Sequence, residues 1–80
     1  MNEQEILEKL SPIFQNVFND DELKLNMELT SEDIDEWSSL SQTLMITEVE
    51  KEFGITFKLR EVAVMDNMDT IVKLIQNKLE

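Results

Sequence analysis

Three stretches of the chain, residues 3–18, 39–53 and 68–79, repeat their apolar residues at the spacing of an α-helix. In the first stretch these residues are Ile6, Leu7, Leu10, Ile13, Phe14, Val17 and Phe18. Steps of three, four and seven place such residues in one stripe along a helix, which buries that stripe against the rest of the protein. The pattern therefore predicts three amphipathic helices.

Pro12 lies inside the first of these stretches. A proline in a helix interior removes one backbone hydrogen bond and clashes with the preceding turn. Because the apolar stripe continues in phase across Pro12, we predict one kinked helix. The alternative is a break, in which Ser11 caps a new helix and Pro12 is its first residue.

The connection after the first helix is long. Its apolar residues are spaced mostly by two and lie among many acids; they are Leu23, Leu25, Met27, Leu29 and Ile34. We interpret residues 19–38 as a loop that these side chains hold against the core. Connections of this length are unusual in a compact domain and are often functional.

The second helix should run from Ser39 to Phe53, because Gly54 then offers a left-handed cap. After this helix, we expect residues 59–64 to form one or two helical turns.

The last helix should run from about Met68 to Leu79, with Asp66 or Asn67 as its N-cap. The predicted fold class is therefore all-α. We expect a small bundle of three main helices and one short helix, with a long loop after the first helix.

The composition limits the chemistry that the chain itself performs. Eighty residues make a single domain, 1–80, with a modest core and little room for a deep enzyme cleft. Cysteine and histidine are both missing, which removes the cysteine nucleophile, the thiolate metal site and the commonest general base. Asp33 and Asp35 alternate as in a calcium loop, but no glycine or closing glutamate completes an EF-hand. We therefore expect neither an enzyme nor a metal-binding protein.

Acidic residues dominate the charge. Seven Lys and Arg against 18 Asp and Glu give a net charge of −11. The segment from Asp20 to Glu36 contains eight acids and a single basic residue, Lys24. This charge argues against nucleic acid or an anionic membrane as the partner and favours a basic protein surface. The sequence shows neither a signal peptide nor an apolar run long enough to span a membrane. We expect a soluble, cytoplasmic protein that works as a monomer.

The second predicted helix has apolar residues on two opposite faces. At about 100° per residue, the predicted core face holds Met45, Ile46, Val49 and Phe53. The opposite face holds Leu40, Leu44, Thr47 and Lys51. Because a helix in a small bundle rarely buries both faces, we predict that Leu40 and Leu44 form an exposed patch for a protein partner. The alternative is that the long loop folds over them, with Trp37 as the cover.

Ser39 opens this helix. Ser39 and Gln42 match a capping box, in which the serine oxygen accepts a hydrogen bond from a free backbone N–H. No familiar triad can form around this serine, so it is not a catalytic nucleophile of the chain's own. A phosphate attached to it would face free N–H groups and the positive end of the helix dipole. The local pattern leaves both roles open: a cap, or a site that another enzyme modifies.

The sequence around this serine resembles the acyl carrier proteins. Ser38-Ser39-Leu40 resembles the Asp-Ser-Leu motif that opens the second helix of that family, and Trp37 precedes the motif as in some members. The stretch from Glu48 to Ile55, EVEKEFGI, resembles the end of the same helix. The resemblance covers the whole chain in length, acidity, long first loop, short third helix and amphipathic last helix.

The resemblance implies a cofactor and its site. Ser39 would carry 4′-phosphopantetheine as a phosphodiester, transferred from coenzyme A by a phosphopantetheinyl transferase. The thiol at the end of this arm would hold acyl groups as thioesters, a role that a chain without cysteine cannot fill itself.

The resemblance also implies a partner surface. Leu40 would lie in the patch that acyl-loading and acyl-processing enzymes with basic surfaces recognise, together with Thr43, Leu44 and Thr47. The core residues of the opposite face would open to shelter an acyl chain.

Three positions depart from the family pattern. Ser38 replaces the aspartate before the modified serine, and Leu44 and Lys51 stand where many fatty-acid carriers have acids. These departures suggest a specialised carrier in fatty-acid, lipid or related biosynthesis. Two alternatives stay open: an aminoacyl or peptidyl carrier of the same fold, and a helical adaptor that binds a partner through Leu40 and Leu44 without a prosthetic group.

Overall fold

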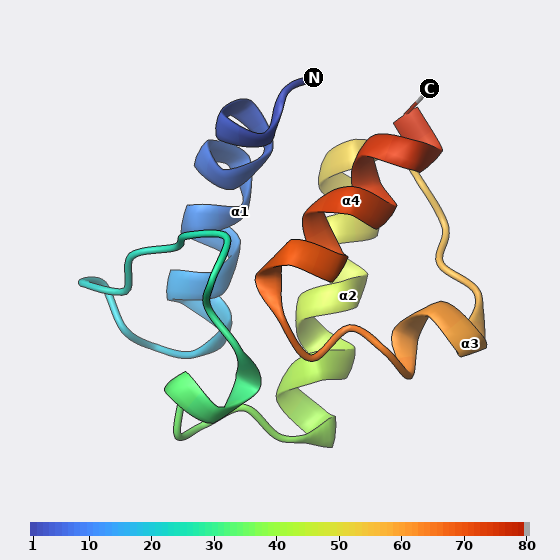
Figure 1. The fold of residues 1–80 in the computed structure, drawn as a ribbon. Helices are drawn as coiled ribbons and strands as arrows, with labels where there is room; N and C mark the ends of the chain where they lie inside the picture. The colour runs from blue at the N-terminus through green and yellow to red at the C-terminus, as the bar shows by residue number, and fades with distance from the viewer. Residues whose placement is uncertain (80) are drawn as a thin grey trace.

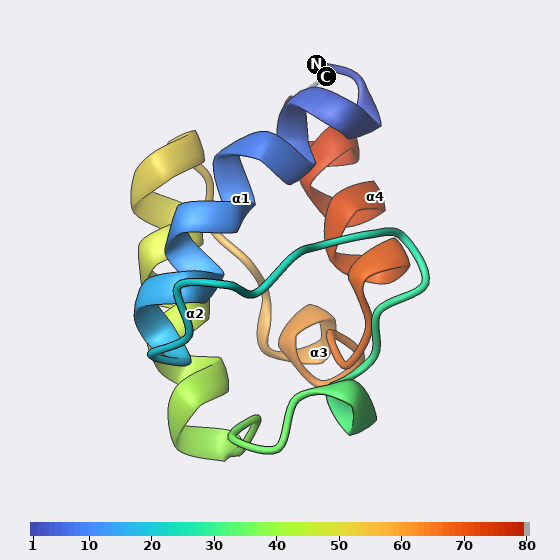
Figure 2. The ribbon, with the colours of Figure 1, turned by 90° about the vertical axis from the view of Figure 1, so that its left-hand side faces the viewer.

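The computed structural model describes residues 1–79 and consists of helices joined by loops. The elements are α1 (Glu3–Val17), the 3₁₀ turn η1 (Ser31–Asp33), α2 (Ser39–Phe53), α3 (Leu59–Val62) and α4 (Met68–Leu79). α2 and α4 run in the direction opposite to α1, and the short α3 lies at one edge of the bundle (Figures 1 and 2). No strand forms within residues 1–79, where one isolated bridge joins Thr30 to Asn67. The predicted all-α fold is confirmed.

One core fills the space between the three long helices. The buried residues that they contribute are Ile6, Leu10 and Phe14 from α1, Met45, Ile46 and Val49 from α2, and Met68, Ile71, Val72 and Ile75 from α4. Phe53, which we predicted on the core face, is only partly buried. It lies in the last turn of α2, at the rim of the core.

α1 continues through Pro12 as a single helix, so the alternative of a break at Ser11 is wrong. Asn2 begins the helix instead, because its side chain accepts a hydrogen bond from the backbone N–H of Glu5 at 2.8 Å. The hydroxyl of Ser11 donates back to the carbonyl of Leu7 at 3.0 Å within the same helix.

The long loop packs on the core as predicted. Its alternating apolar residues are partly buried and the residues between them are exposed, from Leu23 to Leu29. The side-chain amide of Gln15 donates to the carbonyl of Leu23 at 3.0 Å, and the backbone N–H of Met68 donates to the carbonyl of Leu29 at 2.8 Å. These bonds hold the loop to α1 and to the start of α4.

The ends of α2 and α4 lie where the sequence predicts them. Gly54 adopts a left-handed conformation with φ 66°, and its N–H donates to the carbonyl of Glu50 at 2.8 Å. Of the two N-cap candidates of α4, Asn67 fills the role, because its side chain accepts from the backbone N–H of Thr70 at 2.8 Å. Among residues 1–79, no helix is both long and apolar enough to cross a membrane.

Candidate functional site

Three serines share the start of α2, and they have different roles. Ser38 is the N-cap, and its hydroxyl accepts a hydrogen bond from the backbone N–H of Ser41 at 3.3 Å. Ser41 completes the capping box, because its hydroxyl oxygen accepts from the backbone N–H of Ser38 at 2.8 Å and lies 2.8 Å from the carbonyl oxygen of Glu36. The predicted capping box of Ser39 and Gln42 is therefore wrong by one residue.

Ser39 is the first residue of α2 and lies in solvent. Ser38 and Ser41 form the hydrogen bonds of the N-cap, so the Ser39 hydroxyl is not needed there. It forms no hydrogen bond within the described residues. A free, exposed hydroxyl at a helix N-terminus is open to attachment of a group by another enzyme.

The electrostatics at this helix end differ from those of the other helices. The first turns of α1, η1, α3 and α4 all contain acidic residues, whereas the first turn of α2 contains none. Acids in a first turn offset the positive end of the helix dipole. At the start of α2 that positive end is left for an anionic group, in a chain that is otherwise strongly acidic.

A groove of about 240 Å³ begins at Ser39 and runs between α2 and α3. Its lining comes from α2 on one side and from α3 with the residue that follows it on the other: Ser39, Gln42, Thr43, Leu59, Val62 and Ala63. The α3 side is apolar. The residues present thus fit an arm attached to Ser39, with a phosphate at the helix end and an apolar surface beside it.

Sequence reasoning missed the α3 side of this groove. Leu59 is 87% exposed, although it is a large apolar residue in a four-residue helix. Its position opposite Ser39 depends on how α3 packs, and no local pattern reports that packing.

The outer face of α2 is open, as predicted for its two leucines. Leu40 is 72% exposed and Leu44 is 52% exposed, and Thr43 and Thr47 between and beside them are also exposed. Both threonine hydroxyls donate to carbonyls one turn earlier at 3.0 Å. The exposure of this face is confirmed, and its role in docking stays a prediction.

Trp37 does not cover the leucines, so the alternative of a covering loop is wrong. Its ring packs against Phe14 of α1 and Phe18, the residue that follows α1, with ring centroids 5.8 Å and 5.5 Å away. Its indole N–H donates to the side-chain oxygen of Gln42 at 3.2 Å. Trp37 therefore anchors the end of the long loop to the core.

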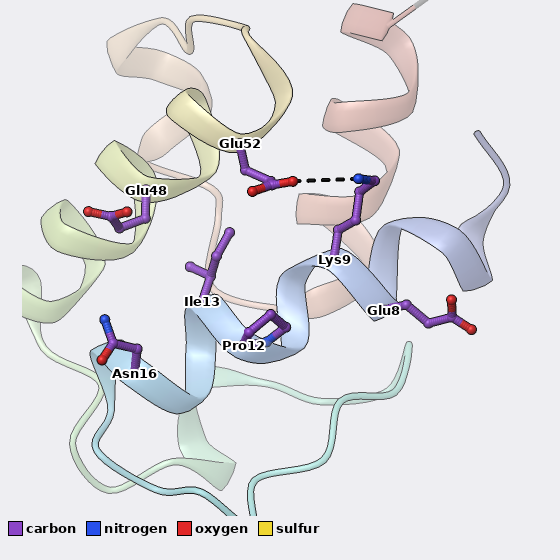
Figure 3. Close-up of a pocket in the computed structure, with 7 residues that line it drawn as sticks. All are labelled: Glu8, Lys9, Pro12, Ile13, Asn16, Glu48 and Glu52. Atoms are coloured by element: carbon purple, nitrogen blue, oxygen red, sulfur yellow. Dashed lines mark hydrogen bonds and ion pairs between the residues drawn. The ribbon is translucent and has the colours of Figure 1, made fainter.

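A second groove lies between α1 and α2, away from Ser39 (Figure 3). Ile13 and Pro12 form its apolar part, and Lys9 reaches across to Glu52 with a distance of 3.5 Å between charged atoms. Exposed pairs of this kind contribute little to stability. The groove has mixed charge and no feature that selects a ligand. Nor does any group of residues within 1–79 have the composition of a metal site.

α3 is tied to α4 by an ion pair. The ammonium of Lys78 lies 2.8 Å from a carboxylate oxygen of Glu61, and 5.6 Å from the centre of the Phe57 ring. The backbone N–H of Lys58, which donates to Glu61 at 2.7 Å, and the ammonium of Lys78 hold the pKa of the Glu61 carboxyl below its usual value of 4.5. The Glu61 carboxylate thus caps the start of α3 and links this helix to α4.

Comparisons with known proteins agree with this architecture. No sequence-family profile and no curated protein matches the chain. Among solved structures, the chain is similar to the solution NMR structure of the holo acyl carrier protein from Geobacter metallireducens. The two are 38% identical in sequence, with a TM-score of 0.84, over 92% of this chain and 85% of that one. This likeness in sequence and fold supports a carrier role, and the chain belongs to the acyl carrier protein family.

Proposed function

We propose that this protein carries acyl groups as thioesters on a 4′-phosphopantetheine arm attached to Ser39. It would present them to partner enzymes of fatty-acid, lipid or related biosynthesis and would catalyse no reaction itself. The observation that carries the proposal is the Ser39 hydroxyl, which is exposed and free of the helix cap, at the only helix start within residues 1–79 that has no acid in its first turn. Membership of the acyl carrier protein family and the holo form of the similar structure support the same role.

Attachment of the arm joins the Ser39 oxygen to a phosphorus of coenzyme A. The hydroxyl oxygen attacks the phosphorus that bears the pantetheine, the adenosine bisphosphate leaves, and the serine proton passes to a base. Because the chain contains no histidine or cysteine, we assign that base to the phosphopantetheinyl transferase. The residues of this chain present the hydroxyl and place the resulting phosphate at the positive end of α2. When attached, the arm supplies the thiol that forms the thioester.

The partner surface is proposed to be the outer face of α2, formed by Leu40, Thr43, Leu44 and Thr47. This face combines two exposed leucines with two exposed threonines, and Glu48 of the same helix is an exposed acid. An apolar centre with a charged rim is typical of specific protein interfaces. Partner enzymes should therefore bring basic patches, which speed encounter with an acidic carrier.

Intact-mass spectrometry tests the attachment. The wild-type chain is incubated with coenzyme A and a phosphopantetheinyl transferase of broad specificity, beside Ser39→Ala and Ser38→Gly. We expect one added arm on the wild type and on Ser38→Gly, and none on Ser39→Ala. Glycine is chosen at position 38 because it caps helices almost as well as serine. A modified Ser39→Ala protein would refute the site.

The helical adaptor is the other candidate that a specific observation favours, namely the 72% exposure of Leu40. It predicts partner binding that does not depend on the arm. If the wild type gains no mass with an active transferase, the adaptor replaces the carrier as the better account.

A further inference from the structure

The side chain of Gln42 bridges two parts of the molecule beside Ser39. Its Nε2 donates to the carbonyl of Val62 at the end of α3 at 2.7 Å, and its Oε1 accepts from the indole of Trp37 at 3.2 Å. An indole only donates and a carbonyl only accepts, so the two partners together fix the orientation of the amide. Gln42 is partly buried, which protects these bonds from water.

Few contacts hold α3 against α2: its partly buried Val62 packs on the core, and Glu50 of α2 accepts from the backbone N–H of Phe57, two residues before α3, at 2.8 Å. α3 has four residues, and none of them is buried. Within residues 1–79, the bond from Gln42 to Val62 is the one side-chain hydrogen bond between the two helices. On its other side, α3 is held to α4 by the ion pair of Glu61 and Lys78. A short helix with so few buried contacts belongs to the parts of a fold that open most easily.

The bond crosses the groove that begins at Ser39. Gln42 and Val62 both line this groove, one from each wall. Trp37, which orients the amide, is itself fixed by its packing on Phe14 and Phe18. Gln42 is thus held from the Trp37 side, and its bond to Val62 restrains the α3 wall of the groove.

We propose that Gln42 is a positioning residue that latches α3 to α2 and sets how far the groove beside Ser39 opens. In the carrier role proposed above, on which this part rests, the latch determines how well an apolar cargo is held between α2 and α3. The latch itself is a property of the unmodified chain and is tested there first.

Hydrogen exchange of the unmodified protein tests the latch through Gln42→Glu. This isosteric change keeps the oxygen that accepts from Trp37 and replaces the donor to Val62 with a carboxylate oxygen. The backbone amides of Ala63, Val64 and Met65, which bond to carbonyls of α3, should exchange roughly 2- to 10-fold faster, the effect of losing one hydrogen bond.

Gln15→Glu is the matched control. Gln15 makes the same kind of bond, from a side-chain amide to the carbonyl of Leu23 at 3.0 Å, on the far side of the core. It should speed exchange in the long loop and leave α3 unchanged. Unaltered α3 exchange in Gln42→Glu, or equal acceleration in both variants, would overturn the latch.

A second measurement separates the latch from the carrier role. Each variant is loaded with an octanoyl thioester, and its cleavage by hydroxylamine is followed by mass. Faster cleavage in Gln42→Glu than in wild type and Gln15→Glu is expected, because the cargo is less sheltered; equal rates would refute control of the cargo by Gln42. If no variant accepts the arm and α3 still loosens in Gln42→Glu, the carrier role fails and the latch stands.

Discussion

Two adjacent serines divide two tasks at the start of α2. Ser38 and Ser41 satisfy the helix end, and Ser39 is left free in solvent. The cap predicted from the sequence, at Ser39, lies one residue too late. The patterns Ser-x-x-Ser and Ser-x-x-Gln overlap at this point, and either serine can begin the helix. The burial of Ser41 and its contact with Glu36 decide between them, and both depend on the path of the preceding loop.

Because the two serines have different roles, alanine substitutions at Ser38 and Ser39 should change the stability by different amounts. Ser38→Ala removes the cap and should lower the free energy of unfolding by about 0.5–2 kcal/mol. Ser39→Ala removes no hydrogen bond and should change it by less than about 0.5 kcal/mol. Urea denaturation of the two variants checks this. A larger loss in Ser39→Ala than in Ser38→Ala would show that the cap is assigned to the wrong serine.

The two faces of α2 predict another contrast between residues. Leu44→Glu lies on the exposed face and should change stability by less than about 0.5 kcal/mol, while weakening docking to a partner enzyme. Met45→Ala, one residue along, empties a fully buried position and should cost about 2–5 kcal/mol. Chemical denaturation and a binding assay with the transferase measure both effects. If Leu44→Glu unfolds the protein, the docking face is wrong.

At the scale of elements, the three long helices and the short α3 were predictable, but the packing of α3 against α2 was not. The bounds of α2 and α4 follow from local signals, namely Gly54 at one end and Asn67 at the other. α3 has no buried residue of its own, and its place is set by Gln42 and Lys78 from other helices. Tertiary contacts of this kind leave no periodic trace in the sequence, so the groove wall opposite Ser39 was missed.

The ion pair of α3 predicts a dependence on pH. Because the folded state lowers the pKa of Glu61, its contribution to stability is present above the usual value of 4.5 and is lost as the pH falls through the lower folded value. A carboxyl titration by NMR should give a pKa for Glu61 that lies below 4.5.

Lys78→Met tests the cause of this shift. It should move the pKa of Glu61 part of the way back, since the hydrogen bond from the backbone N–H of Lys58 remains. An ordinary pKa for Glu61 in the wild-type protein would contradict the ion pair.

At the scale of the whole molecule, the net charge of −11 affects both stability and partner binding. All eight acids between Asp20 and Glu36 are exposed, so they repel one another in the folded chain. Salt up to physiological ionic strength should raise Tm by screening this repulsion, and it should weaken binding to basic partners. Differential scanning calorimetry across a salt series checks the first effect. A Tm that falls with salt would mean that attractive pairs, such as that of Lys78, dominate instead.

The central claim is that Ser39 alone carries the arm, and fragmentation of the modified wild-type protein tests it most directly. After incubation with coenzyme A and transferase, tandem mass spectrometry of the peptide that spans Trp37 to Leu40 distinguishes the two serines. The account predicts the whole added mass on Ser39. Mass on Ser38, or a peptide that stays unmodified beside an active transferase, would contradict it.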